Sequence, residues 1–212
     1  MTSDRMTVHT ALETLLAGNR RFTAGTPEHP NQDAARRTAT APAQSPFAVL
    51  FGCSDSRLAA EIIFDRGLGD LFVVRTAGHV MGPEVLGSIE YGVSVLGSPL
   101  VVVLGHDSCG AVAATRAAVQ DGTTATGYVR DVIERVTPSV LAARAAGHTE
   151  DSDFIDTHIH HTVDLLLERS RTLADAVEAG TAAVIGLSYR LADGTAHPVI
   201  TRGIELPAGT AS

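Results

Sequence analysis

Cysteine and histidine side chains with the spacing of a metal site stand at two places in this 212-residue chain. The first place holds Cys53 and the second holds His106-x-x-Cys109. Two soft thiolates and one imidazole favour zinc over magnesium or calcium. A structural zinc site normally has four protein ligands on paired Cys-x-x-Cys hooks, which this sequence lacks, whereas three ligands leave one position open. The residue types therefore predict a catalytic zinc ion held by Cys53, His106 and Cys109.

An acidic and a basic residue close to the first cysteine bear on whether the site is open. Asp55 lies two positions after Cys53, where its carboxylate can reach the metal as a fourth ligand. Arg57 can instead hold Asp55 in a bidentate ion pair, because a guanidinium fork matches a carboxylate. Zinc with two thiolates and a neutral imidazole is formally neutral, which permits a bound water to ionise. A fourth, carboxylate ligand makes the site negative and removes the place for water, and the residues alone leave both arrangements open.

Both ligand segments end apolar runs that are typical of strands buried on two faces of a parallel sheet, over residues 47–52 and 100–105. The carboxyl ends of parallel strands meet at the ligand crevice of an α/β protein. Cys109 then starts an alanine-rich helix, whose amino-terminal end lowers the pKa of a thiol. Further strands are predicted over residues 71–74, 182–191 and 196–201.

Helical spacing and capping signals predict the remaining elements. Thr10-Ala-Leu-Glu13 matches a capping box at the start of a first helix, which Gly18 or Gly25 would end. Further helices are predicted over residues 33–40, 59–64, 84–96, 109–120, 128–144 and 153–178, with Pro138 interrupting the one that starts at 128. The expected fold is α/β: a single domain with a mostly parallel central β-sheet flanked by helices, an N-terminal helical arm and an antiparallel edge strand at the C-terminal end.

Composition and charge exclude several classes of protein. The net charge is −8 and the sequence has no lysine and no basic run, so we expect no nucleic-acid partner and no anionic membrane partner. The longest apolar stretch is far too short for a bilayer span, and the polar amino terminus lacks the apolar core of a secretory signal. We therefore expect a cytoplasmic globular protein, in which a disulfide between the two cysteines is not favoured. At roughly 150 residues per domain, the length favours one domain over residues 1–212, with a helical arm and linker over 1–32 and a frayed tail over 207–212.

Residues 53–57 and 106–110, which read Cys-Ser-Asp-Ser-Arg and His-Asp-Ser-Cys-Gly, together resemble the signature of the β-class carbonic anhydrases. Residues 75–78, Arg-Thr-Ala-Gly, are similar to the Arg-Asn-Ala-Gly segment of that family, with threonine in place of the usual asparagine. The resemblance covers nearly the whole chain and is strongest to actinobacterial members.

The resemblance implies reversible hydration of carbon dioxide to bicarbonate and a proton by a zinc-bound hydroxide, with one zinc ion per subunit. It assigns Cys53, His106 and Cys109 as the zinc ligands. Asp55 is then either the fourth ligand or, when paired with Arg57, an acceptor for the hydroxide, so that the pair controls access to the metal. Our hypothesis is that Asp55 binds zinc at acid pH and that Arg57 captures it at alkaline pH.

The resemblance also implies a subunit arrangement. The basic unit of the family is a homodimer, often paired again as a dimer of dimers, and its amino-terminal helices reach across to a partner. Gln44 matches a glutamine that contacts substrate from a neighbouring subunit, and the amide of Gly110 can donate to a substrate oxygen. The apolar stripe of the first helix fits such an arm, although plain core has the same pattern; it consists of Leu12, Leu15, Leu16 and Phe22.

Some bacterial members bind bicarbonate at a regulatory pocket of tryptophan, arginine and tyrosine. Arg75 and Tyr189 match two of these residues, but Leu50 stands where the tryptophan would be, so we do not expect that pocket here.

Histidines outside the two motifs carry weaker signals. His158, His160 and His161 are interpreted as part of a solvated helix face rather than a second metal site, because no cysteine or carboxylate cluster accompanies them. His79 is expected to line the crevice, with a role in proton transfer as a secondary idea.

Two alternatives to carbon dioxide hydration stay open: a hydrolase of carbonyl sulfide or carbon disulfide on the same scaffold, and a non-catalytic zinc-binding protein whose Asp55 never leaves the metal.

Overall fold

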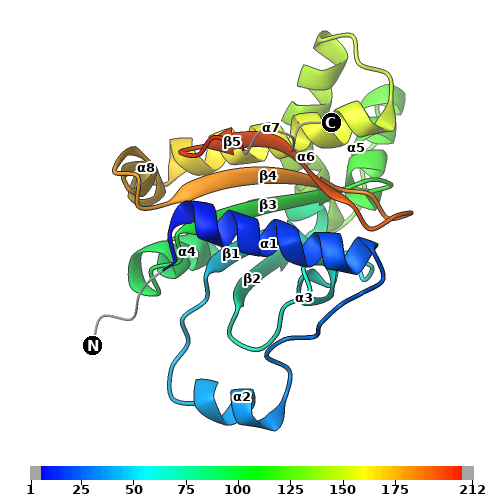
Figure 1. Ribbon diagram of the computed structural model, residues 1–212. Coiled ribbons are helices and arrows are strands. Elements are labelled where there is room, and N and C mark those ends of the chain that lie inside the picture. Colours follow the sequence, from blue (N-terminus) through cyan, green and yellow to red (C-terminus); the bar gives the residue numbers. More distant parts are fainter. Residues whose placement is uncertain (1–5, 207–212) are drawn as a thin grey trace.

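The computed structural model describes residues 6–206 as a five-stranded sheet with helices on both faces (Figure 1). The strand order is β2-β1-β3-β4-β5, in which β1 to β4 are parallel and β5 is antiparallel to β4. The strands are β1 (Ala48–Cys53), β2 (Leu71–Thr76), β3 (Leu100–His106), β4 (Ala183–Tyr189) and β5 (Ala196–Arg202). The expected fold class, with an antiparallel edge strand at its C-terminal end, is confirmed.

Helices and helical turns connect and cover the strands. They are α1 (Val8–Thr23), α2 (Ala34–Thr40), α3 (Ala60–Ile63), the short turn η1 (Ala77–His79), α4 (Pro83–Glu90), the π-helical turn η2 (Tyr91–Val95), α5 (Gly110–Asp121), α6 (Val129–Ala145), α7 (Asp151–Arg169) and α8 (Arg171–Glu178). In Figure 1, α1 crosses one face of the sheet, while α7 lies on the other beside α5 and α6. No helix within residues 6–206 has the length and apolar character to cross a bilayer. The frayed tail expected over 207–212 lies outside the described residues.

The centre of the sheet is the core of the molecule. Every residue of β1, β3 and β4 is buried, as expected for parallel strands covered on both faces. These strands consist mainly of valine, leucine, isoleucine and alanine, and the molecule has no tryptophan. The edge strand β2 is only half-buried. The central strands therefore hold their carboxyl ends rigidly, and those ends carry Cys53 and His106.

The first helix departs from its expected boundaries. It starts three residues before the predicted capping box, because Thr7 is the N-cap and its hydroxyl accepts a hydrogen bond from the amide of Thr10 at 3.2 Å. Gly18 does not end the helix but lies inside it, against the backbone at the C-terminal end of α3. A Cβ atom at Gly18 would be 1.8 Å from the carbonyl oxygen of Phe64, so glycine permits this close approach.

The apolar stripe of α1 packs within its own chain. Leu12, Leu15 and Leu16 are buried, and Phe22 is packed against the same core. Buried Asn19 fastens the helix to the rest of the molecule: its amide donates to the carbonyls of Ile63 and Gly194, and its oxygen accepts from Ala196. The stripe is therefore part of the core of its own chain in this structure.

Two further helices differ from the sequence-based boundaries for local reasons. Pro138 does not interrupt α6, since the carbonyl that loses its i+4 partner belongs to Glu134, on an exposed part of the helix. The long helix predicted over 153–178 is divided at the buried residue Ser170. Its hydroxyl caps α8 by accepting from the amide of Leu173 and donates to Glu90 at 2.6 Å.

The segment between α1 and α2, predicted as a linker, is fixed to the body of the protein by Asp65. This carboxylate accepts hydrogen bonds from the amides of Glu28 and His29 at 3.0 and 2.9 Å, and from Nε of Arg21 at 2.6 Å. Burial raises the pKa of Asp65, but these donors outweigh that effect and leave its pKa below the usual value. The ionised carboxylate therefore organises the turn that leads to α2.

Replacing Asp65 by asparagine should lower the free energy of unfolding by about 2 kcal/mol, because the amide leaves buried donors poorly paired. The folded-state pKa of Asp65 is lower than its unfolded value of about 3.9, so its contribution is present above that value and is lost as the pH falls through the folded-state pKa. Urea unfolding at pH 7 and at pH 3 measures this. The matched control is Asp175→Asn, which changes an exposed carboxylate paired with Arg171 and should alter stability little. An equal effect of both variants at pH 7 would contradict the role of Asp65.

Candidate metal centre

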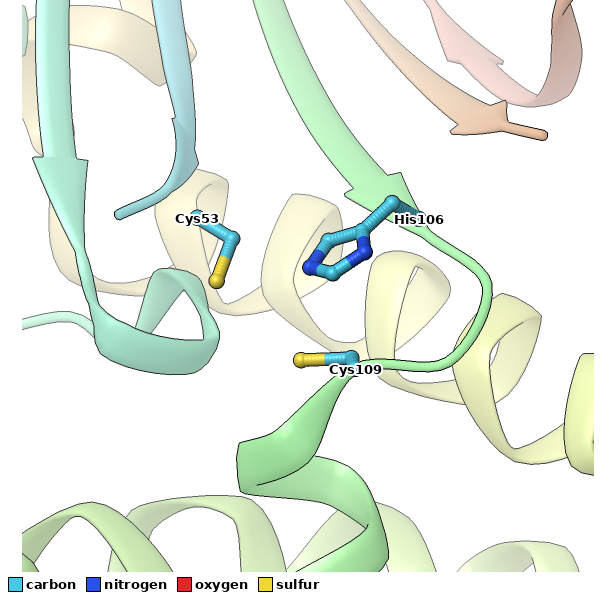
Figure 2. Close-up of side chains that lie close together, drawn as sticks. All are labelled: Cys53, His106 and Cys109. Carbon is cyan, nitrogen blue, oxygen red and sulfur yellow. The ribbon is translucent and has the colours of Figure 1, made fainter. Parts of the chain in front are cut away.

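The structure brings Cys53, His106 and Cys109 together at the carboxyl edge of the sheet. One sulfur or nitrogen atom of each lies within 4.8 Å of the others, and all three residues are buried. Figure 2 shows the two sulfur atoms and the imidazole converging on one small space. Among residues 6–206 this is the one cluster of three such side chains close enough to share an ion.

Strand pairing accounts for this convergence. Strands β1 and β3 are parallel neighbours in which Gly52 pairs with Leu104, so both end at the same edge of the sheet. Cys53 is the last residue of β1 and His106 the last of β3. A short turn then brings Cys109 to the N-cap of α5. A metal site spread widely along the sequence is thus assembled by one pair of strands.

His106 presents a single nitrogen atom to the cluster. Its Nδ1 lies 2.8 Å from the carbonyl oxygen of Asp107, which can only accept, so Nδ1 carries the proton and Nε2 has a free lone pair. Nε2 is buried and has no hydrogen-bond partner in the described part of the chain. A buried imidazole nitrogen without a partner beside two sulfur atoms is a donor set that suits zinc.

Hydrogen bonds prepare Cys53 to act as a thiolate. The neighbouring thiol of Cys109 lowers the pKa of Cys53 to about 4 against the opposing effect of burial, and the amide of Gly78, which donates to the Cys53 sulfur, acts in the same direction. The pKa of Cys109 is raised, because its proton is shared with the Cys53 sulfur and because it is buried. The two sulfur atoms therefore share a hydrogen bond, whose proton a bound cation would displace.

Asp55 lies beside the cluster and is held by Arg57. Nε and Nη2 of Arg57 donate to the two carboxylate oxygens at 2.9 and 2.7 Å, and the amide of Arg57 donates at 2.9 Å. This pairing lowers the pKa of Asp55 well below its usual value, so the carboxylate is ionised. Its Oδ2 is still only 4.0 Å from Nε2 of His106. Asp55 is thus paired with Arg57 in this structure and lies within a short movement of the ligands.

Arg75 and Gly78 support the end of β1. Nε of Arg75 donates to the carbonyl of Cys53 at 2.9 Å, and its guanidinium also contacts the carbonyl of Asp55. The amide of Gly78 donates to Sγ of Cys53 at 3.2 Å. Gly78 has a left-handed backbone (φ 62°), and a Cβ there would be 2.6 Å from the Cβ of Ala111 in α5. The Arg-Thr-Ala-Gly segment therefore holds both the backbone and the sulfur atom of the first ligand.

The structure does not bring every predicted site residue to the cluster of its own chain. Gln44 is exposed in the loop before β1, at the opposite end of that strand from Cys53. Gly110 is exposed at the first position of α5, directly after Cys109, and the space where its Cβ would lie is open. Leu50 is buried in β1.

His158 lies elsewhere than expected, and His79 is nearly enclosed. His158 is not on a solvated helix face: it is 3% exposed and forms two hydrogen bonds inside the protein. Burial lowers the pKa of His158 to about 4. His79 is 1% exposed, and its ring lies 4.3 Å from that of His158, centroid to centroid; both histidines line a cavity of about 360 Å³ between α6 and α7. Burial also lowers the pKa of His79, which makes it a poor proton carrier near neutral pH.

The burial of His158 had a signal in the sequence. It lies three residues after Ile155 and four before Thr162, both of which are buried on α7. That spacing places His158 on the apolar face of the helix.

Comparisons with known proteins agree with this site. A family model described as "Carbonic anhydrase" matches residues 48–196, which contain all three candidate ligands. The chain is 56% identical to "Carbonic anhydrase 2" of Mycobacterium tuberculosis over 186 residues, covering 88% of this chain and 90% of the relative. It is also 56% identical to a carbonic anhydrase of Mycolicibacterium smegmatis over 184 residues, covering 87% of this chain and 89% of the relative.

Solved structures share the fold. The β-carbonic anhydrase CafA of Aspergillus fumigatus has a TM-score of 0.68 and 25% identity, covering 92% of both chains. A structure from a study of two tetrameric β-carbonic anhydrases of Sordaria macrospora has a TM-score of 0.67 and 22% identity, covering 90% of this chain and 95% of that one. The architecture, the ligand cluster and the sequence relatives define one class of enzyme. The chain belongs to the β-carbonic anhydrase family.

The two cysteines of the chain provide a direct assay of the site. When zinc is bound, both thiols should resist a thiol reagent, and about one zinc ion per chain should be found by elemental analysis. Removal of the metal with a chelator should expose about two reactive thiols per chain, because both sulfur atoms are ligands. His106→Ala should lower the zinc content without removing a thiol. Full zinc content in His106→Ala, or unchanged thiol reactivity after chelation, would contradict this ligand set.

Proposed function

We propose that the protein catalyses the reversible hydration of carbon dioxide to bicarbonate at a zinc ion held by Cys53, His106 and Cys109. The observation that carries this proposal is the buried cluster of two sulfur atoms and an unpartnered imidazole nitrogen in a member of this family. When bound, zinc would supply a Lewis acid that makes water nucleophilic near neutral pH. Three protein ligands leave room at the ion for solvent, as this chemistry requires.

Asp55 and Arg57 are proposed to control that open position. The structure has Asp55 bound to Arg57 through two side-chain hydrogen bonds, which hold its Oδ2 4.0 Å from Nε2 of His106. An ionised carboxylate there can accept a hydrogen bond from the reacting oxygen and so orient it. Once Arg57 no longer holds it, Asp55 can itself become a ligand and close the site.

Gly110 and Gln44 are proposed to contact substrate. The amide of Gly110 belongs to the first turn of α5, where backbone N–H groups have no helical partner and favour negative charge. It can therefore donate to an oxygen of carbon dioxide as charge develops there. Gln44 would act from a neighbouring subunit, which agrees with its exposed position away from the cluster of its own chain.

The active unit is proposed to be a homodimer, which can pair again as a dimer of dimers, because a glutamine contributed in trans requires a second chain. The structural neighbours from Sordaria macrospora are described as tetrameric. We place the enzyme in the cytoplasm, where both free cysteines would stay reduced and able to bind metal.

Stopped-flow measurement of carbon dioxide hydration across pH is the main test. The zinc-loaded protein should hydrate carbon dioxide, and Cys53→Ala should be inactive because it loses a ligand. Carbonyl sulfide and carbon disulfide are to be tested in parallel, since the ligand set alone does not distinguish these linear substrates. Turnover of those gases without hydration of carbon dioxide would overturn the proposal in favour of a hydrolase. Full zinc content without any turnover would instead favour a non-catalytic zinc protein.

Arg57→Gln should lower kcat/KM for hydration by about 10- to 100-fold, the effect typical of losing an outer partner of a metal site. Without the guanidinium, Asp55 is free to occupy the position that solvent needs.

The wild-type pH profile of hydration should also lose activity below neutral pH. Asp55 is ionised throughout that range, so the loss reflects the falling concentration of hydroxide that competes with it.

The matched control for Arg57→Gln is Arg171→Gln, which breaks an exposed ion pair with Asp175 on α8. It should leave the hydration rate at the wild-type level. Counting metal ligands by X-ray absorption should detect an added oxygen ligand in Arg57→Gln. A wild-type rate in Arg57→Gln, or a wild-type profile that is flat below neutrality, would contradict the role of this pair.

A further inference from the structure

A continuous chain of buried hydrogen bonds links helices α6 and α7 to the first metal ligand. Ser139 Oγ of α6 lies 2.8 Å from Nδ1 of His158 on α7. Nε2 of His158 lies 2.8 Å from the carbonyl oxygen of Gly78, and the amide of Gly78 donates to Sγ of Cys53 at 3.2 Å. Both side chains behind Gly78 are buried, Ser139 completely and His158 to within 3%. We call these four residues the Ser139–Cys53 relay.

The direction of each hydrogen bond follows from chemistry. The Gly78 carbonyl can only accept, so Nε2 of His158 must carry the proton. Nδ1 is then an acceptor, and the Ser139 hydroxyl donates to it. Each atom of the relay thus has one role, and His158 is held as a single tautomer in a single orientation.

Gly78 transmits this orientation because its two backbone groups face different partners. Its carbonyl points to His158 and its amide to Cys53. Its left-handed backbone needs glycine, and Ala111 lies against its α-carbon on the side of α5. Helix α7 in turn reaches the sheet because Gly105 has no side chain: a Cβ there would be 2.6 Å from Ile159, the neighbour of His158. The position of Gly78 is therefore determined from both sides.

We propose that His158 is a positioning residue for the metal centre, which acts through Gly78 by holding its amide onto the sulfur atom of Cys53. An N–H group on a thiolate draws charge from the sulfur and fixes its direction, and such bonds tune thiolate–metal centres. His158 thereby sets how strongly Cys53 donates to the metal and how slowly the metal leaves. This inference rests on the metal site of the proposed function but not on the reaction.

The simpler interpretation is that His158 only joins α6 to α7. Both roles predict some loss of thermal stability on substitution, so stability alone does not separate them. The spectrum of the metal–thiolate bond does, because it responds to the hydrogen bond on sulfur and not to the stability of a distant helix contact.

The experiment uses full-length protein loaded with cobalt(II) and, separately, with zinc. In His158→Leu, the cobalt–thiolate charge-transfer band should move to longer wavelength, since a sulfur that loses its N–H partner donates more readily. Release of zinc to a chelator should become about 10- to 100-fold faster. His158→Gln, whose side-chain amide can donate to the Gly78 carbonyl, should restore most of both properties.

Three further variants complete the test. His160→Leu makes the same change at an exposed position of the same helix and should match wild type. Val163→Ala removes buried atoms of α7 away from the relay, so it should lower the melting temperature without moving the cobalt band. Ser139→Ala leaves His158 in place but removes the hydrogen bond that orients it, so the cobalt band should shift less, in the same direction. This variant also provides the test if His158→Leu does not fold.

A cobalt band at the wild-type position in both His158→Leu and Ser139→Ala, with zinc release no faster than in Val163→Ala, would overturn the proposal. If His158→Leu does not fold, a wild-type band and release rate in Ser139→Ala alone would overturn it. Equal defects in His158→Gln and His158→Leu would also count against it. These measurements do not use carbon dioxide. An enzyme inactive in hydration with an altered cobalt band in His158→Leu would therefore disprove the proposed function and leave the relay standing.

Discussion

The in-register pairing of β1 with β3 is the constraint on which the rest of the structure depends. Because the two strands are parallel neighbours, their carboxyl ends coincide, and a residue that ends one lies next to a residue that ends the other. The ligands need no long loop to meet. This arrangement requires a wholly buried sheet centre, so every residue of these strands before their last position is apolar, and chemistry is left to the positions where they end.

The groups around this edge of the sheet form three sets, which differ in their position relative to the metal site. The ligands point inward, Asp55 and Arg57 lie at the exposed rim, and Arg75 and Gly78 hold the backbone behind. The rim pair is accessible enough to rearrange, whereas the supporting groups are fixed by several contacts each. A metal centre that must exchange solvent without losing its ion requires both kinds of surroundings.

Much of this arrangement could be predicted from the sequence. The apolar runs before Cys53 and His106 predicted β1 and β3, and the rule for parallel strands then predicted that the ligands would meet. The sequence could not decide whether Asp55 binds the metal or Arg57, because Asp55 lies two residues from Cys53 and two residues from Arg57. It also misplaced His158, whose partners Gly78 and Ser139 are remote in sequence and come together only when α6 and α7 pack against the sheet. Helix ends such as Ser170 were missed because tertiary contacts, here with Glu90, decide where a serine caps.

The separation of the ligands along the chain has a consequence for the order of events during folding. His106 and Cys109 are close in any conformation. Cys53 joins them only after β1 and β3 have paired, and these strands are separated in the sequence by α3, β2 and α4. Such non-local pairing is slow, because a long loop must close first. In a chain that has not yet folded, His106 and Cys109 can therefore bind an ion only weakly, as two ligands. Tight binding requires that the centre of the sheet has formed. Metal uptake would then report the completion of folding rather than initiate it.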